Sequence, residues 1–206
     1  MGSEFNKILA YQSNIIKPVI AIGGLSGTGK TTLGINLQKR LKQKGFNLPF
    51  YESGYFFRKI AKEKGYLEKD LEKFSAVFVE GLDEMIDVQC VKQMVETGGI
   101  FVGRLVHVLC GNKGFRIFLK VDPEVAARRI SLDENRPEKG LGISELMQKI
   151  KARDQEDVNR YAKLYGIDYK QTINECDLVI DTSKLDKKSV LKISEIGCLN
   201  YLKSLV

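Results

Sequence analysis

The sequence predicts an α/β fold built on a parallel sheet of five strands. Short runs of β-branched and other apolar residues recur along the chain, and such runs are typical of strands buried on both faces. Segments with apolar residues at helical spacing separate these runs, which favours strand–helix–strand units over hairpins. The 206 residues suffice for one domain with a full core and are too few for two ordinary domains.

Each element follows from a local pattern. The first strand, 19–22, is an apolar run that ends at Gly23-Gly24. A helix begins near Lys30, because leucines recur there every fourth residue until Gly45, a natural helix stop. The other strands are expected at 48–51, 100–102, 115–121 and 178–180, and the other helices within 54–97, on both sides of a charged loop at 133–142, and from about 187 onward.

Composition excludes several classes of protein. A single histidine, His107, argues against a His-rich metal site and against a Ser/His/Asp triad. The four cysteines are widely spaced without a C-x-x-C pair, which is typical of reduced, intracellular thiols. No apolar run approaches the roughly 20 residues of a membrane span. Residues 2–5 resemble a cloning remnant, no signal peptide is visible, and we expect a cytoplasmic protein.

A phosphate-binding loop follows the first strand. The residues Gly24-Leu25-Ser26-Gly27-Thr28-Gly29-Lys30-Thr31 match G-x-x-x-x-G-K-[ST] between a strand and a helix. The glycines let backbone N–H groups wrap the phosphates, and the helix dipole adds attraction for anions. Lys30 is expected to bridge the β- and γ-phosphates, Thr31 to ligate Mg²⁺, and Thr32 to complete the ATP site. The loop alone leaves kinase, GTPase, ATPase and motor open.

The arginines are gathered where phosphate would be handled. Lys and Arg total 33 against 26 Asp and Glu, a net charge of +7, but only nine of the 33 are Arg. On a helix, Arg153, Asp157 and Arg160 share one face and can grip a phosphate; the alternative is a solvated face with one weak ion pair. Arg129 and Arg136 flank the charged loop and could close over the phosphates as a lid.

Several segments, taken in order, resemble the nucleoside monophosphate kinases, and archaeal-type cytidylate kinases most closely. The segments are 52–58 with an S-G-x-x-x-R pattern, Gly103-Arg104-Leu105, the Arg-x-x-x-Asp-x-x-Arg of 153–160, and those at 161–168 and 177–182. The resemblance covers roughly residues 18–195. It implies a P-loop NTPase fold of three α/β/α layers, with strand order 2-3-1-4-5 and a short lid.

The resemblance also implies an activity and a set of site residues. The activity is the transfer of a phosphoryl group from ATP, with Mg²⁺, to a nucleoside monophosphate, CMP or dCMP being favoured. The residues expected to act in catalysis are Lys30, Arg129, Arg153 and Arg160. Those expected to bind the acceptor nucleotide are Ser53, Arg58, Arg104, Arg153, Asp157 and Arg160. Arg129 matches a lid arginine of the family, whereas Arg136 is assigned from its position in the loop.

We expect one kinase domain over 15–206, preceded by an extension at 1–14. Within it, about 53–97 would bind the acceptor and about 130–145 would form the lid. The expected partners are ATP and a nucleoside monophosphate, with the protein acting as a monomer. The scattered lysines and the lack of an aromatic–basic motif argue against a nucleic-acid partner.

Three positions depart from the family pattern. Val102 stands where the family carries an acid before Gly-Arg, Gln89-Cys90 stands where an Arg-Gln pair reads the base, and Asp133 stands at a second lid arginine. Two alternatives therefore stay open. The first is a kinase of another small acceptor, such as UMP, AMP or a phosphorylated metabolite. The second is a nucleotide-binding or regulatory protein with little catalysis.

Overall fold

The computed structural model describes residues 3–67, 81–133 and 141–205. In chain order the elements are α1 (Ser3–Gln12), β1 (Val19–Gly24), α2 (Lys30–Gln43), β2 (Phe50–Glu52), α3 (Ser53–Glu63), α5 (Leu82–Thr97), β3 (Gly99–Val102), α6 (Val106–Leu109), the 3₁₀ helix η2 (Gly111–Lys113), β4 (Phe115–Lys120), α7 (Pro123–Ser131), α8 (Ile143–Tyr165), α9 (Tyr169–Asn174), β5 (Leu178–Asp181) and α10 (Lys187–Lys203). The five predicted strands are all present, each within two residues of its expected bounds.

The strands form one parallel sheet in the order β2-β3-β1-β4-β5, which confirms the predicted topology. The central strand β1 pairs with β3 on one side, where Ile20 lies opposite Ile100, and with β4 on the other, where Ile22 lies opposite Ile117. All strands run in the same direction, so their carboxyl ends share one edge of the sheet. The loops that leave this edge are where ligands bind in folds of this type.

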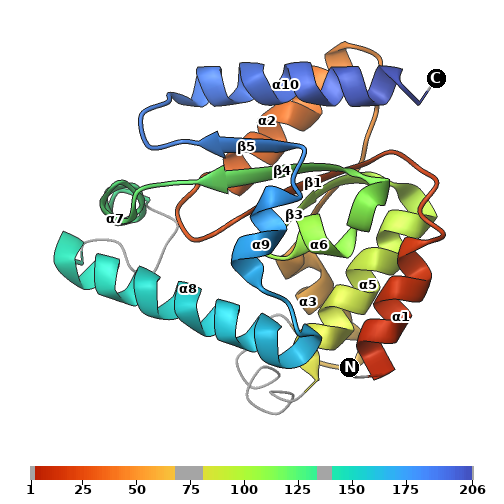
Figure 1. The fold of residues 1–206 in the computed structure, drawn as a ribbon, viewed down its shortest axis with the longest axis horizontal. Helices are drawn as coiled ribbons and strands as arrows, with labels where there is room; N and C mark the ends of the chain where they lie inside the picture. The colour runs from red at the N-terminus through yellow and green to blue at the C-terminus, as the bar shows by residue number, and fades with distance from the viewer. Residues whose placement is uncertain (1–2, 68–80, 134–140, 206) are drawn as a thin grey trace.

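Helices cover both faces of the sheet, which is why the strands read as continuous apolar runs. Ile20 and Ile22 of β1 point to the face covered by α2 and α10, whereas Val19 and Ala21 point to the face of α1, α5 and α6. Figure 1 shows α2 and α10 on one side of the sheet, α1, α5, α6, α8 and α9 on the other, and α7 beyond the end of the strands. The expected three layers are therefore present.

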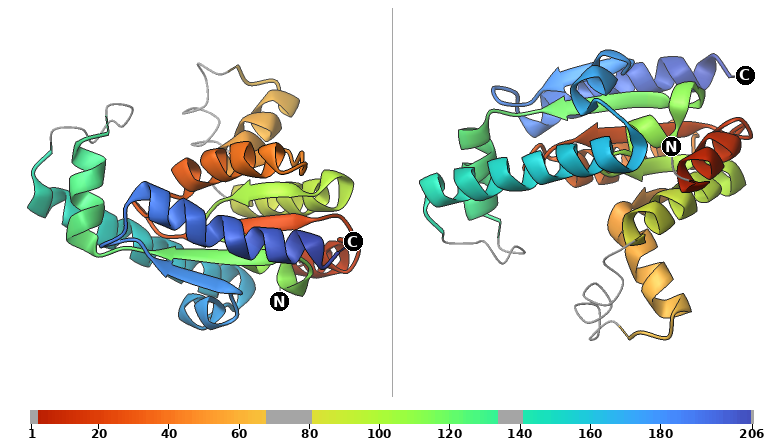
Figure 2. Two further views of the ribbon diagram at one scale, coloured as in Figure 1. Left: turned by 90° about the horizontal axis from the view of Figure 1, so that it is seen from above. Right: turned by 60° about the horizontal axis from the view of Figure 1, so that its bottom comes forward.

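Within the N-terminal extension expected for 1–14, residues 3–12 form a helix. Helix α1 packs against α5, and its Ile8 is fully buried in the core on that face of the sheet. Figure 2 shows α1 lying beside α5. The division of the chain into an acceptor-binding part and a lid stays a prediction, and 68–80 and 134–140 of those parts lie outside the described residues.

Two features of α7 set the position of α8, the helix that carries much of the predicted acceptor site. Helix α7 starts at Asp122, whose carboxylate accepts hydrogen bonds from the N–H groups of Glu124 and Val125. Ala127 and Ile130 of α7 then pack against Leu146 and Ile150 of α8. This contact anchors the start of α8, which runs beneath the sheet towards α5 (Figure 1).

None of the helices described here is both long and apolar enough to span a membrane.

Candidate functional site

The predicted phosphate loop joins β1 to α2 at the carboxyl edge of the sheet. Its Gly29 precedes the helix with φ 89°, a left-handed conformation that favours glycine. Lys30 Nζ donates to the carbonyl oxygen of Leu25 at 2.6 Å and to Thr28 Oγ1 at 3.5 Å, so the ammonium group lies over the loop. The loop thus combines a helix N-terminus with a lysine, the arrangement that attracts polyphosphate.

Thr31 and Thr32 occupy the first turn of α2, and both are exposed. An exposed hydroxyl beside a phosphate loop fits Mg²⁺, a hard cation that takes one or two protein oxygens together with phosphate oxygens and water. In the described parts of the chain, no group of three or more His, Cys, Asp or Glu is placed to hold a metal ion. The residues therefore fit a metal that arrives with a nucleotide, with Thr31 as the expected protein ligand.

Val102 supplies no carboxylate to this edge of the sheet. It is 3% exposed and belongs to the apolar cluster with Leu33 and Leu37 of α2. A Cβ atom added to Gly34 would lie 2.7 Å from Val102 Cγ2, so α2 and β3 approach each other closely there. The neighbouring residue on β2 in the sheet register is Glu52, which brings the nearest strand-borne acid to the same edge.

Ser53 and the Gly103-Arg104 segment lie against one another. Ser53 starts α3, and its Oγ donates to the carbonyl oxygen of Val102 at 3.4 Å. A Cβ at position 103 would lie 2.2 Å from Ser53 Oγ and 2.9 Å from Val106 Cγ1, so a larger residue there would have to displace these side chains. Arg58 is exposed one turn further along α3, with Nη1 over Gly54. The structure therefore brings Ser53 against the segment that carries Arg104, whereas the contact described for Arg58 lies within α3.

Arg104 is the centre of a polar network between the loop and α8. Its Nη2 donates to Ser26 Oγ at 3.0 Å, and its Nη1 forms ion pairs with Asp157 and, at 3.8 Å, with Asp154. The hydroxyl of Tyr169 donates to the Arg104 carbonyl oxygen at 2.7 Å and fixes the backbone. The arginine side chain is 18% exposed, so its guanidinium is held in place while part of it stays open to a ligand.

The two arginines of α8 lie next to this network. Arg160 donates to Asp157 and pairs with Asp83 of α5, Nε to Oδ2, at 3.0 Å. Arg153 is exposed, and its positive charge lies close enough to Arg104 to lower the pKa of that guanidinium, after the larger effect of burial. Three of the four arginines predicted for the acceptor phosphate are thus gathered here with Asp157, the fourth being Arg58 of α3, and their roles stay predictions.

The lid arginines are less completely placed. Arg129 of α7 donates from Nη1 to Thr182 Oγ1 at 2.9 Å and from Nη2 to the Thr182 carbonyl oxygen at 2.7 Å. Thr182 Oγ1 also contacts the Thr28 carbonyl oxygen at 3.4 Å, which links Arg129 to the phosphate loop. Arg128 faces solvent and pairs with Glu124, and Arg136 lies outside the described residues.

Two further residues singled out by the sequence lie in the core. Cys90, at the position of the family's base-reading pair, is 2% exposed and packs within the apolar cluster around Met94. His107 is buried, its Nε2 lies 3.0 Å from Thr172 Oγ1, and burial lowers its pKa to about 3. Both side chains therefore act in packing.

Sequence reasoning missed Asp154 and Asp83. Asp154 directly follows Arg153 and precedes Asp157 by three residues, so helical spacing puts both acids on one face of α8 and could have indicated it. Asp83 lies on α5, about 70 residues before α8, and no local pattern connects the two helices. Its contact with Arg160 depends on how the helices pack.

Asp87 is a third acid on this side of the molecule, and it predicts a dependence of stability on pH. Tyr165 Oη donates to Asp87 Oδ2 at 2.7 Å, and removal from solvent raises the pKa of Asp87 from 3.8 to about 7. Because the folded-state pKa exceeds the unfolded one, the folded state binds the proton more tightly. The stability from this group is therefore complete below about pH 4 and is lost as the pH rises to about 7.

We expect Asp87→Asn to remove the loss of stability at higher pH, because the amide oxygen still accepts the hydrogen bond and carries no charge. At pH 8 the variant should melt about 5 °C above the native protein, and at pH 4.5 the two should melt together. The control is Glu63→Gln, which removes an exposed acid. Thermal unfolding from pH 4.5 to 8 measures the effect, and parallel curves for the native protein and Asp87→Asn would contradict it.

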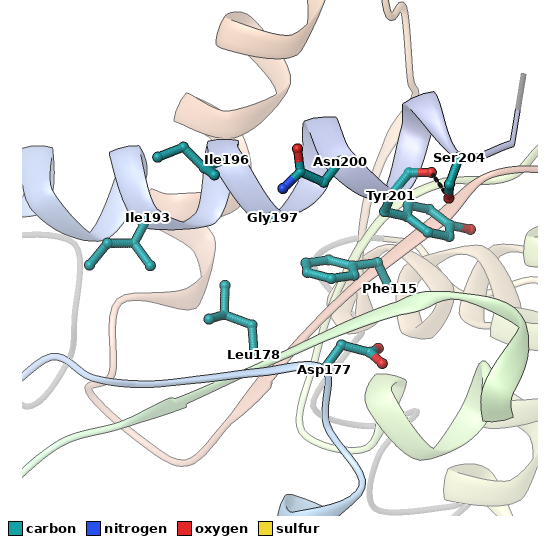
Figure 3. A pocket seen from close by; sticks show the side chains of 9 residues that line it. All are labelled: Phe115, Asp177, Leu178, Ile193, Ile196, Gly197, Asn200, Tyr201 and Ser204. Carbon is teal, nitrogen blue, oxygen red and sulfur yellow. Dashed lines mark hydrogen bonds between the residues drawn. The ribbon is translucent and has the colours of Figure 1, made fainter.

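A groove of about 600 Å³ lies elsewhere, between α10 and the sheet (Figure 3). Its floor is formed by Phe115 and Leu178, at the amino ends of β4 and β5, and Ile193 and Tyr201 of α10 line its other side. Because the strands are parallel, this is the edge of the sheet opposite the phosphate loop. The groove is therefore separate from the candidate site.

Comparisons with known proteins agree with this geometry. The sequence model of the Cytidylate kinase-like family matches residues 19–184. A cytidylate kinase of Methanocaldococcus jannaschii is 34% identical over 189 residues, which covers 90% of this chain and 99% of that protein. One of Pyrococcus abyssi is 33% identical over 175 residues, which covers 85% of this chain and 90% of that protein.

Solved structures share the fold at low sequence identity. A shikimate kinase from Bacteroides thetaiotaomicron has a TM-score of 0.59 and 20% identity, covering 89% of this chain and 97% of that chain. An uncharacterized protein from Eubacterium ventriosum has a TM-score of 0.62 and 16% identity, covering 91% and 99%. These likenesses establish the architecture alone, since the identities are low.

Proposed function

Because this chain belongs to the cytidylate kinase-like family, we propose that it transfers the terminal phosphoryl group of ATP to CMP or dCMP. The chain is a kinase, and its relatives support a nucleoside monophosphate as the acceptor. The observation that carries the proposal is the hydrogen bond from Arg104 to Ser26. Arg104, which we expect to bind the acceptor, thereby lies against the expected ATP-binding loop, and the two phosphates would meet there.

The reaction needs positioning and charge neutralisation more than covalent chemistry. An oxygen of the acceptor phosphate forms a bond to the γ-phosphorus while the bond from that phosphorus to the bridging oxygen breaks, and ADP leaves. The acceptor phosphate is already ionised at neutral pH, so no strong base is required. Lys30 and Arg129 would stabilise negative charge on the transferring group, while Arg58, Arg104, Arg153 and Arg160 would hold the acceptor phosphate.

Mg²⁺ would bind with ATP and neutralise part of the phosphate charge, with the Thr31 hydroxyl as its protein ligand. The protein's own contribution to metal binding is small at β3, because Val102 faces the apolar cluster on α2. The phosphate loop and its lysine therefore supply most of the protein contacts to the triphosphate.

The acceptor is tested by the release of ADP in the presence of ATP, Mg²⁺ and one candidate acceptor at a time. We expect CMP and dCMP to stimulate ADP release well above UMP, AMP and non-nucleotide acceptors. Stimulation by none of the pyrimidine monophosphates would contradict the proposal. If a different monophosphate is preferred, the protein still acts as a nucleoside monophosphate kinase, but the proposed acceptor is wrong.

A further inference from the structure

Asp154 of α8 reaches into the phosphate loop. Its Oδ1 accepts a hydrogen bond from the backbone N–H of Ser26 at 3.3 Å and another from Ser26 Oγ at 3.0 Å. Ser26 is 8% exposed, and the Asp154 side chain is 16% exposed. One N–H donor of the loop is therefore already bound by a carboxylate. That carboxylate belongs to α8, a helix that begins more than 100 residues later in the chain.

The Asp154 carboxylate thus lies where a nucleotide phosphate is expected to bind. The backbone N–H groups of such a loop are the donors for nucleotide phosphates. One N–H group cannot donate with good geometry to a carboxylate and a phosphate at once, and like charges repel at this separation. A phosphate oxygen that takes the Ser26 N–H must therefore displace Asp154 Oδ1.

The same carboxylate also bears on the acceptor side of the site. Arg104 Nη2 donates to Ser26 Oγ, which in turn donates to Asp154 Oδ1, so the hydroxyl relays one contact to the other. Arg104 Nη1 lies 3.8 Å from Asp154 Oδ1 and also pairs with Asp157, which is 7% exposed. Asp157 is the buried partner of Arg104, and Asp154 is the more accessible one.

We propose that Asp154 is a positioning residue that couples the two substrate sites by holding Ser26 and Arg104 together until nucleotide binds. The proposal rests on the proposed function for its acceptor half. When a phosphate oxygen takes the Ser26 N–H, the Asp154 side chain turns out towards solvent. The relay through Ser26 Oγ is then broken, and one edge of the Arg104 guanidinium becomes available to the acceptor phosphate. Asp157 retains the other edge, so Arg104 stays oriented.

The first test measures binding of a non-hydrolysable ATP analogue without any acceptor. Asp154→Asn removes the competing charge and keeps the shape, so the variant should bind the analogue roughly tenfold more tightly than the native protein. Asp154→Glu keeps the charge and should not show this gain. The matched control is Glu156→Gln, which removes an exposed acid from the same helix and should change affinity less than twofold. Unchanged or weaker binding by Asp154→Asn would overturn the proposal, because a purely structural residue gives that result.

The second test measures coupling between the sites. The dissociation constant of CMP is determined with and without the ATP analogue. In the native protein the analogue should tighten CMP binding several-fold, and in Asp154→Asn this ratio should approach one. Equal ratios in the two proteins would overturn the coupling.

The two proposals fail in different ways. If CMP is not phosphorylated by the native protein, the proposed acceptor is wrong, while the binding of the ATP analogue still tests Asp154. If Asp154→Asn does not fold, as judged by thermal unfolding, Ser26→Ala replaces it in the second test. That variant keeps the backbone N–H but removes the hydroxyl relay, so it should abolish the coupling, and retained coupling would overturn the proposal.

Discussion

Replacing Lys30 by Ala is expected to lower kcat/KM for ATP by roughly a hundredfold to a thousandfold. The ammonium group lies over the phosphate loop, 2.6 Å from the Leu25 carbonyl oxygen, at the place where the triphosphate would bind. Loss of one preorganised donor to a transferring group has an effect of about this size. Lys30 is the first residue of α2 and is partly exposed, so little stability should be lost with its side chain.

The measurement is steady-state kinetics with ATP varied at saturating acceptor. Lys39→Ala is the control, because it removes an exposed lysine from the same helix and leaves the loop intact. The control should retain activity within twofold. A Lys30→Ala variant within tenfold of the native kcat/KM would mean that another group neutralises the transferring phosphoryl.

Replacing Arg104 by Met should have an effect of similar size on activity, together with a loss of stability. Its guanidinium lies between Ser26, Asp154 and Asp157, and the side chain is only 18% exposed. Without it, Asp157 keeps its ion pair with Arg160 but loses the one with Arg104, and Asp154 loses its ion pair with the guanidinium. Breaking a buried ion pair by removing one partner costs about 3–5 kcal/mol, and we expect kcat to fall about a thousandfold.

Arg104→Lys separates charge from geometry. Lysine restores the positive charge but cannot reach Ser26 and Asp157 with a planar fork, so its activity should lie between those of the native protein and Arg104→Met. Arg128→Met is the control, because Arg128 is an exposed arginine paired with Glu124, and its loss should change stability by less than about 0.5 kcal/mol. Thermal unfolding and kinetics with the acceptor varied measure both effects. Native-like activity in Arg104→Met would remove Arg104 from the acceptor site.

The strands and the phosphate loop could be predicted because their signals are local. Val19 to Ile22 is apolar at every position, since both faces of β1 are covered, and the loop between Gly24 and Thr31 has fixed residue types at fixed spacing. The helix at 3–12 was not predicted, because a ten-residue helix whose apolar face is covered by a distant helix carries a weak signal alone.

The candidate site could be predicted only in part. Arg153, Asp157 and Arg160 lie within one helix, so their spacing was enough to predict that they share one face of it. The partners of these residues could not be found in this way. Arg160 pairs with Asp83 of α5, and Arg129 with Thr182 at the end of β5, and both contacts join elements that are distant in the chain.

Residue types within one element or one turn were enough to predict the α/β class, the phosphate loop and the gathering of arginines. What those arginines contact depends on how the elements pack. The packing of α7 on α8 anchors the helix whose Asp154 contacts Ser26, and Val102 lies in the apolar cluster with α2. Such contacts depend on side chains that meet across elements, and chain order does not encode those distances locally. The charged residues of the site can therefore be identified from the sequence, whereas their partners depend on how the elements pack in the fold.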